Sequence, residues 1–217
     1  MSTHSGRPEG VVPLETIASI LAPFRISLSE AQLTAIQRYL SLLLSWNRAM
    51  NLTAIDDPAE ILARHFGESL FAVSFLDLNP SRLADVGTGP GFPGLPLKIA
   101  VPEMRLTLIE ANLKKCAFLT EVSQRLELAG VEIVKGRFQE AVSRDRKFEF
   151  VCSRALGSFS EFLPWARAAL SPGGEIVLWL GTDDSLRLAL HKEFAWEAPV
   201  PIPESRRRVI MVGRRQD

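Results

Sequence analysis

Three glycines and an acid in the segment DVGTGPGFPGLPL (85–97) form the pattern in this chain that most directly suggests chemistry. Glycines at 87, 89 and 91 permit a sharp turn and let a ligand approach main-chain atoms that a Cβ would shield. The dinucleotide fingerprint G-x-G-x-x-G requires a glycine where this chain has Phe92. A carboxylate at Asp85 would repel a pyrophosphate but suits a ligand that carries a sulfonium, as S-adenosylmethionine does. The loop therefore favours S-adenosylmethionine as the cofactor, and a dinucleotide site or a structural turn are the alternatives.

A second acid, Glu110, ends the apolar run RLTLIE (105–110) that follows the glycine loop. At the end of the second strand of a nucleotide-binding fold, a carboxylate can accept hydrogen bonds from both ribose hydroxyls. S-adenosylmethionine and NAD both carry that diol, so Glu110 supports a nucleoside cofactor without choosing between them. The alternative is that Glu110 caps the helix expected after it.

These motifs lie where a parallel sheet would position them. Short apolar runs alternate with helix-compatible stretches, which predicts βαβ units and an α/β fold with helices on both faces of the sheet. The expected strands are 82–86, 105–110, 131–135, 148–153 and 175–180, and the expected helices lie near 93–100, 113–129, 158–170 and 184–192. The glycine loop then falls at the carboxyl edge of the sheet, where open α/β folds bind ligands. The run RRRVIMV near the end is a candidate edge strand.

The first 80 residues predict helices instead. Ser29 and Gln32 have capping-box spacing, and apolar residues then recur at steps of three or four. A further helix is expected from about Pro58 to Phe75, with the proline in its first turn. We therefore expect a small helical N-terminal domain over 1–80, with a frayed tail over 1–12, and an α/β domain over 81–217.

Composition and charge narrow the class of protein. The 217 residues are 47% hydrophobic and 23% charged, as in soluble globular proteins, and no apolar run approaches the roughly 18 residues that span a bilayer. The 25 basic residues balance 25 acidic ones, which counts against a diffuse basic surface for nucleic acid. Cys116 and Cys152 have no metal-ligand spacing. We expect a monomeric protein of the cytoplasm that holds no metal.

With these pieces placed, the sequence resembles the bacterial 16S rRNA guanine-N7 methyltransferases of the glucose-inhibited division type. The segments that carry the resemblance occur in the family's order: SWNRAMNLTAI (45–55), RHFGESL (64–70), DVGTGPGFPGLPL (85–97), LIEANLKKCAFL (108–119) and SRALGSF (153–159). The similarity covers about residues 30–180. The first two segments lie outside the cofactor domain, where other methyltransferases have no reason to share them.

The resemblance implies a Rossmann-like enzyme that transfers a methyl group from S-adenosylmethionine to N7 of one guanine in small-subunit ribosomal RNA. Together with the loop pattern it indicates a cofactor site at the ends of the strands, made of Asp85, Gly87, Gly89, Phe92, Glu110, Phe138, Gln139 and Arg154. Phe138 and Gln139 fall where the adenine is expected. The alternatives are a core aromatic at Phe138 and a structural ion pair between Arg154 and a helix carboxylate.

Two positions depart from the family pattern. Glu68 stands where the family usually has aspartate, which keeps the charge, and Leu180 stands where it usually has lysine. If that lysine contacts RNA, this chain has lost a charged contact. The departure leaves open a diverged methyltransferase with another substrate, and a non-catalytic ribosome-binding relative is a further alternative.

The expected reaction needs little acid–base chemistry. Guanine N7 carries an in-plane lone pair and no proton, so its attack on the methyl group requires no general base. We assign no catalytic residue and expect Arg154 to position the substrate, with Lys114 and Arg137 as further cations for the guanine O6 edge. The candidates for RNA contact are Asn47, Arg64, His65, Lys114 and Arg137. The alternatives are that Asn47 caps or turns a helix end, that His65 is structural and that Lys114 is a solvated charge.

Overall fold

The computed structural model describes residues 11–141, 146–154 and 159–216. The expected frayed tail lies outside these residues except for Val11 and Val12, which belong to no helix or strand. The last part of the SRALGSF segment also lies outside them, apart from Phe159.

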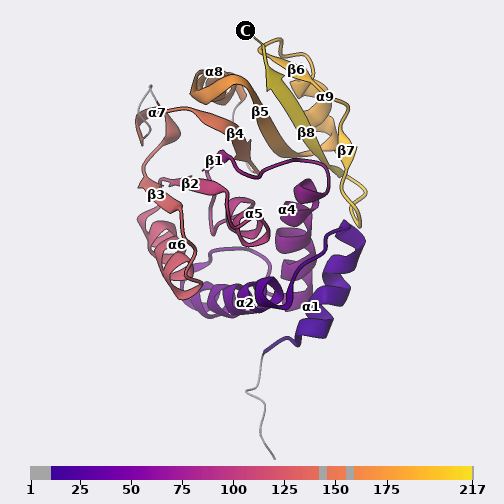
Figure 1. The fold of residues 1–217 in the computed structure, drawn as a ribbon, viewed down its shortest axis with the longest axis vertical. Coiled ribbons are helices and arrows are strands. Elements are labelled where there is room, and N and C mark those ends of the chain that lie inside the picture. Colours follow the sequence, from indigo (N-terminus) through magenta and orange to yellow (C-terminus); the bar gives the residue numbers. More distant parts are fainter. Residues whose placement is uncertain (1–10, 142–145, 155–158, 217) are drawn as a thin grey trace, which may run out of the picture.

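A twisted sheet with the order β3-β2-β1-β4-β5-β8-β6 forms the centre of the molecule, and β7 pairs with β8 (Figure 1). The first five strands run parallel: β1 (Arg82–Val86), β2 (Arg105–Glu110), β3 (Val131–Lys135), β4 (Phe148–Ser153) and β5 (Leu170–Gly181). All five strands predicted from the sequence are therefore confirmed, and β5 begins five residues before its predicted start. The strand order reverses between β1 and β4, and the glycine loop follows β1 at this switch point, where α/β sheets bind ligands.

The last three strands extend the sheet in the antiparallel sense. They are β6 (Phe194–Trp196), β7 (Val200–Pro201) and β8 (Arg208–Arg215). The strand predicted at RRRVIMV is confirmed as β8, but its predicted place at the edge of the sheet is wrong, because β6 and β7 pair with its other side. Because β8 runs against β5, its first residue, Arg208, pairs with Gly181 at the carboxyl end of β5. An arginine from the end of the chain thus reaches the edge of the sheet that carries the glycine loop.

Helices cover both faces of the sheet, as the alternating pattern predicted. The helices between and after the strands are α5 (Gly94–Ala100), α6 (Leu113–Arg125), α7 (Phe138–Ala141), α8 (Phe159–Ala169) and α9 (Thr182–Leu188). The side chain of Asn112 caps α6 by accepting the backbone N–H groups of Lys114 and Lys115. Glu110 is therefore not the residue that caps this helix.

The N-terminal region consists of α1 (Leu14–Leu21), a short turn η1 (Ala22–Phe24) and the long helix α2 (Glu30–Met50). The predicted capping box is confirmed: Ser29 Oγ accepts the Gln32 N–H at 3.3 Å, and Gln32 Oε1 accepts the Ser29 N–H at 2.8 Å. The amide of Gln32 also donates to the carbonyls of Ile99 and Ala100 at the end of α5. The Gln32 side chain thus takes part in the N-terminal cap of α2 and also links this helix to α5 by hydrogen bonds.

The helix expected over 58–75 is present as one helical run of four pieces: α3 (Pro58–Ile61), a π-helical turn η2 (Leu62–Gly67), α4 (Glu68–Leu70) and a 3₁₀ turn η3 (Phe71–Ser74). Asp57 caps its first turn by accepting the Glu60 N–H at 2.7 Å. The π-helical turn holds Arg64 and His65, so the residues of the RHFGESL segment sit on a widened stretch of helix.

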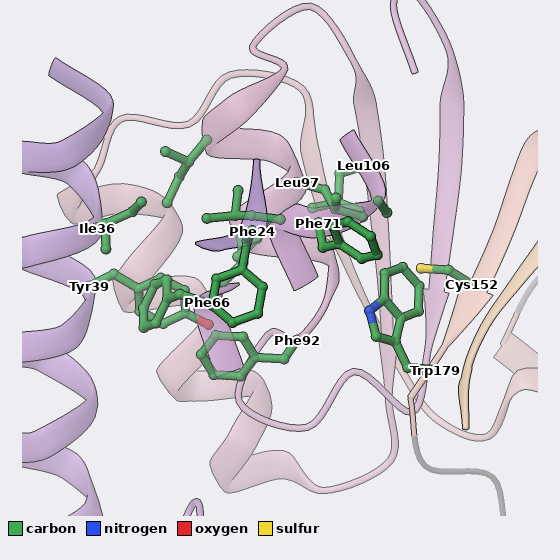
Figure 2. Packing of buried hydrophobic residues seen from close by; sticks show 14 of the residues in the cluster. Phe24, Ile36, Tyr39, Phe66, Phe71, Phe92, Leu97, Leu106, Cys152 and Trp179 are labelled. Atoms are coloured by element: carbon green, nitrogen blue, oxygen red, sulfur yellow. The ribbon is translucent and has the colours of Figure 1, made fainter. Parts of the chain in front are cut away.

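One hydrophobic core joins the N-terminal helices to the sheet. Tyr39 of α2 and Phe66 of η2 belong to the same buried cluster as Leu106 of β2 and Trp179 of β5 (Figure 2). Ile17 of α1 is part of this cluster as well. A second cluster fills the opposite face of the sheet, beneath α8 and α9. The expected boundary near residue 80 is thus a change of secondary structure along the chain, while the core continues across it. No helix among the described residues has the length and apolar character to cross a bilayer.

Candidate cofactor and substrate site

The three glycines of the loop after β1 serve two different purposes. Gly87 and Gly89 have positive φ angles of 66° and 60°, and a Cβ added to either would meet no atom within 4 Å. Their backbone conformation favours glycine, and the space beside them is open to a ligand. Gly91, with φ of 104°, is different, because a Cβ there would collide with the Tyr39 hydroxyl and come within 2.5 Å of Leu95 Cδ1. Gly91 therefore permits close packing against α2.

Asp85, near the end of β1, holds the glycine loop by accepting hydrogen bonds from it. Its side chain is fully buried, and Oδ2 accepts hydrogen bonds from Thr88 Oγ1 at 2.6 Å and from the Gly94 N–H at 2.8 Å. Burial raises the pKa of Asp85 to about 6, against the opposing effect of the bonds from Thr88 and Gly94. Oδ1 is buried with no hydrogen-bond partner among the described residues. The carboxylate therefore organises the loop, and its predicted attraction for a sulfonium stays a prediction.

Glu110 supports the same loop from the end of β2. One carboxylate oxygen accepts the Gly89 N–H at 2.9 Å and the other accepts the Asn112 N–H at 2.8 Å. An ionised carboxylate offers about four acceptor sites, so these two bonds leave capacity for two hydroxyl groups. The arrangement fits a ribose diol beside the open glycines and also gives Glu110 a structural role in holding the loop.

Phe92 lies in the hydrophobic core (Figure 2). Its ring stacks on Tyr39 with centroids 5.4 Å apart and lies 4.9 Å from the ring of His65. The Tyr39 hydroxyl donates to the Pro90 carbonyl, so α2 holds the loop at two neighbouring positions. Phe92 thus shapes the loop through packing. Tyr39 was not predicted as a site residue, although a tyrosine on the apolar face of a helix is a signal for a buried hydroxyl that needs a hydrogen-bond partner.

Phe138 and Gln139, which were expected to contact the adenine of the cofactor, are the first two residues of α7. Phe138 is partly buried and packs edge-on against Phe162 and Trp165 of α8, with centroids 5.7 and 5.2 Å away. Gln139 is exposed and donates to Glu161 at 2.9 Å. These contacts favour the alternative of a packed aromatic at Phe138, and an adenine contact stays a prediction.

Arg154, directly after β4, forms a buried ion pair. Its Nη2 lies 3.2 Å from Oε2 of Glu68, whose side chain is 4% exposed. The other oxygen of the same carboxylate, Oε1, pairs with Nη2 of Arg208 at 2.7 Å. Trp179 of β5 donates its indole N–H to the Glu68 carbonyl at 2.7 Å. The structural ion pair considered for Arg154 is thus present. Arg208 could not be predicted from the sequence, because only the register of β8 decides which arginine of the run at 206–208 faces Glu68.

His65 carries no charge at neutral pH. Burial, and then the charges of Arg154, Arg64 and Arg208, lower its pKa to about 3. Its Nε2 lies 2.8 Å from Thr53 Oγ1, while Nδ1 is buried without a partner among the described residues. A neutral, enclosed imidazole favours the structural role over an electrostatic contact with RNA.

The other candidates for RNA contact occupy different surroundings. Asn47 is buried, and its amide accepts the Thr53 N–H and donates to Asp56, which favours its role at the helix end. Arg64 pairs with Glu60 at 2.6 Å on the helix surface. Lys114 and Arg137 are exposed at the start of α6 and after β3, and both stay predictions.

Leu180 is buried opposite Val209 in the pairing of β5 with β8. Its side chain belongs to the hydrophobic cluster beneath α8 and α9, so this position brings no charge to the site. The next pair in the register, Gly181 with Arg208, brings an arginine to the same strand end. Among the described residues, no group of three or more His, Cys, Asp or Glu side chains could hold a metal ion.

Comparisons with known proteins agree with this geometry. A family model described as rRNA small subunit methyltransferase G matches residues 32–197. The ribosomal RNA small subunit methyltransferase G of Pseudomonas aeruginosa is 40% identical over 184 residues, which cover 81% of this chain and 84% of that protein. The protein of the same name from Herminiimonas arsenicoxydans is 36% identical over 87% of this chain and 90% of its own length.

Solved structures with low sequence identity share the fold. A SAM-dependent methyltransferase from Aquifex aeolicus has a TM-score of 0.63 at 15% identity and covers 76% of this chain and 97% of that one. A methyltransferase from Pyrococcus furiosus has a TM-score of 0.60 at 16% identity, over 82% of this chain and 96% of that one. The fold is therefore that of Rossmann-like methyltransferases.

Proposed function

Because this chain belongs to the rRNA small subunit methyltransferase G family, we propose that it methylates N7 of a guanine in 16S ribosomal RNA, with S-adenosylmethionine as the methyl donor. The observation that supports the cofactor site is the open side of the glycine loop. The backbone of Gly87 and Gly89 is bare there, and Glu110 beside it keeps acceptor capacity for a diol. We further propose that the protein acts as a monomer in the cytoplasm, where ribosomal RNA is found.

The residues of the site would act by binding and alignment. S-adenosylmethionine supplies a methyl group on a positively charged sulfur, which an unprotonated nitrogen can attack directly. The loop from Asp85 to Phe92 and the carboxylate of Glu110 would hold the donor, and Arg154 would help to position the RNA substrate. Holding two reactants in line can contribute roughly 7–11 kcal/mol to catalysis in well-oriented systems. Guanine N7 offers no proton for a base to remove, so this mechanism assigns no proton transfer to His65.

Labelled methyl transfer to 16S ribosomal RNA from a strain that lacks the family's enzyme tests the proposal. We expect incorporation into RNA, and nucleoside mass spectrometry should identify 7-methylguanosine. Incorporation into a small molecule but not into RNA would favour the diverged methyltransferase that Leu180 suggests. Binding of S-adenosylmethionine without any methyl transfer would favour the non-catalytic relative.

A substitution in the loop tests the cofactor site separately. Gly87→Val should reduce the affinity for S-adenosylmethionine by at least a hundredfold, because a branched side chain would fill the open space beside the backbone. Gly173→Val is a matched control: Gly173 also has a positive φ, 71°, and open space beside it, but it lies near the amino end of β5. Titration calorimetry should show normal affinity for the control. Equal losses in both variants would mean that backbone strain, and not the ligand site, explains the effect.

A further inference from the structure

Two arginines share one buried carboxylate at the carboxyl edge of the sheet. Oε2 of Glu68 pairs with Arg154 at 3.2 Å, and Oε1 of Glu68 pairs with Arg208 at 2.7 Å. A single arginine would neutralise the carboxylate, so the second leaves this trio with one surplus positive charge. An uncompensated cation that is partly withdrawn from water is unfavourable, and the surplus therefore indicates a missing anion.

The trio lies beside the open glycine loop. Arg154 follows β4, which pairs with β1, and β1 leads into the loop. Arg208 pairs with Gly181 at the end of β5, which runs parallel to β4. The side chains of Arg154 and Arg208 are 17% and 29% exposed, whereas that of Glu68 is 4% exposed. Both arginine side chains are therefore partly exposed to solvent, while the carboxylate that they share is enclosed.

Among the described residues, the neighbouring charges do not cancel the surplus at the surface. His65 is neutral, and Arg64 is paired with Glu60. Asp85 also acts on Arg154, but its carboxylate is fully enclosed beneath the glycine loop. Burial, together with Arg208 and Arg64, lowers the pKa of Arg154 to about 10, against the opposing effect of Glu68 and Asp85.

We propose that Arg154 and Arg208, oriented by Glu68, bind one phosphate group of the RNA substrate next to the cofactor site. This inference rests on the proposed function. The planar fork of a guanidinium matches the oxygens of a phosphate, and two forks held by one carboxylate present their donors in a fixed geometry. Glu68 is a positioning residue in this arrangement. A localised site of this kind also accounts for RNA recognition by a chain whose formal net charge is zero.

The salt dependence of RNA binding tests the phosphate contact. Fluorescence anisotropy with labelled, unmethylated 16S ribosomal RNA should give a linear plot of log affinity against log salt concentration. Arg208→Gln should reduce the slope by about 1. Arg214→Gln is the matched control, because Arg214 is an exposed arginine at the other end of the same strand, paired with Glu175. The control should keep the wild-type slope.

Two results would overturn the phosphate contact. One is an equal slope in Arg208→Gln and the wild-type protein. The other is an equal change in Arg208→Gln and Arg214→Gln, which would mean that only total charge matters. Arg208→Gln should also keep the thermal midpoint and the affinity for S-adenosylmethionine, and a loss of either would show instead that Arg208 serves the fold or the cofactor.

Glu68→Gln separates positioning from charge. The variant keeps both arginines and adds one net positive charge, so electrostatics alone would strengthen RNA binding. If Glu68 positions the arginines, kcat for methyl transfer should fall at least tenfold while KM for RNA stays the same or decreases. An unchanged kcat would contradict the positioning role.

Failure of this inference differs from failure of the proposed function. Wild-type protein that methylates ribosomal RNA, combined with an unchanged slope in Arg208→Gln, rejects the phosphate site alone. Wild-type protein that binds S-adenosylmethionine but neither binds nor methylates ribosomal RNA rejects the proposed function, and with it this site.

Discussion

Asp85 and Glu110 both accept backbone hydrogen bonds from the glycine loop, yet their surroundings differ. Glu110 retains 8% exposure and spare acceptor capacity, whereas Asp85 is fully enclosed with one oxygen unpaired among the described residues. The enclosed carboxylate is ionised at neutral pH in spite of its raised pKa of about 6. Its charge is therefore unfavourable for folding, and we attribute its presence to the cofactor that the loop receives.

Asp85→Asn should stabilise the protein at pH 7 and weaken its affinity for S-adenosylmethionine. A folded pKa of about 6, against an ordinary 3.8, means that ionisation costs about 3 kcal/mol at pH 7. Asparagine can still accept the bonds from Thr88 and Gly94. As the pH falls through 6, Asp85 of the folded wild-type protein becomes protonated and the cost of its buried charge is removed. The stability advantage of the variant over the wild-type protein should therefore vanish below pH 4. Denaturant unfolding at pH 7 and pH 4 measures the change in stability, and titration calorimetry measures the affinity for S-adenosylmethionine. A variant that is destabilised equally at pH 7 and pH 4 would show that the charge of Asp85 is not unfavourable for folding.

His65 titrates in the opposite sense. Its folded pKa of about 3 lies below the ordinary 6.5, so the unfolded chain binds the proton first. Its contribution to stability is complete above pH 6.5 and is lost as the pH falls from there towards 3. His65→Gln should therefore show a smaller loss of stability between pH 6.5 and pH 4 than the wild-type protein does. Parallel curves of unfolding free energy against pH for the two proteins would show that the imidazole is not the titrating group.

At the scale of elements, α2 and the glycine loop are packed as one unit. Tyr39 donates to the Pro90 carbonyl and stacks on Phe92, and Gly91 leaves the space that the tyrosine hydroxyl fills. A helix outside the sheet thus helps to set the shape of the loop.

A double substitution tests this packing. Gly91→Ala should destabilise the protein by roughly 2–4 kcal/mol, through an unfavourable positive φ and a collision with the Tyr39 hydroxyl. Tyr39→Phe removes that hydroxyl, so the double variant should lose less than the sum of the two single variants. A coupling of at least 1 kcal/mol in a double-mutant cycle is expected. Additive losses would mean that the hydroxyl is not what excludes the methyl group.

β1 and β2 were predictable because both of their faces are buried in the sheet. Both strands read as nearly continuous apolar runs, and their predicted bounds agree with the structure residue for residue. β6 and β7 were missed because they span only three and two residues, and one of these is Pro201. The glycine loop and Glu110 could be placed from the sequence, since both lie at strand ends. The direction of the Phe92 ring and the partner of Arg208 depend on tertiary packing, which no local pattern encodes.

At the scale of the whole molecule, the continuous core means that the helices and the sheet depend on each other. Buried side chains from α1, α2 and η2 fill one face of the sheet, including Ile17, Tyr39 and Phe66. Neither region could lose the other without exposing that face to water.

Thermal unfolding should therefore be a single cooperative transition. We expect the calorimetric enthalpy to equal the van't Hoff enthalpy within error, and fluorescence from Trp46 of α2 and Trp179 of β5 to change at the same temperature in variants that retain only one of them. Two separated transitions, with the Trp46 signal lost first, would show that the helical region unfolds independently.

Tyr39 is the one tyrosine in the sequence, and it sits between α2 and the loop. Protein grown on fluorotyrosine would carry a single fluorine nucleus at this contact, with no substitution in the chain. The chemical shift of this fluorine would report changes in the contact between α2 and the glycine loop as ligands are added. The single tyrosine thus offers a specific spectroscopic probe of the loop.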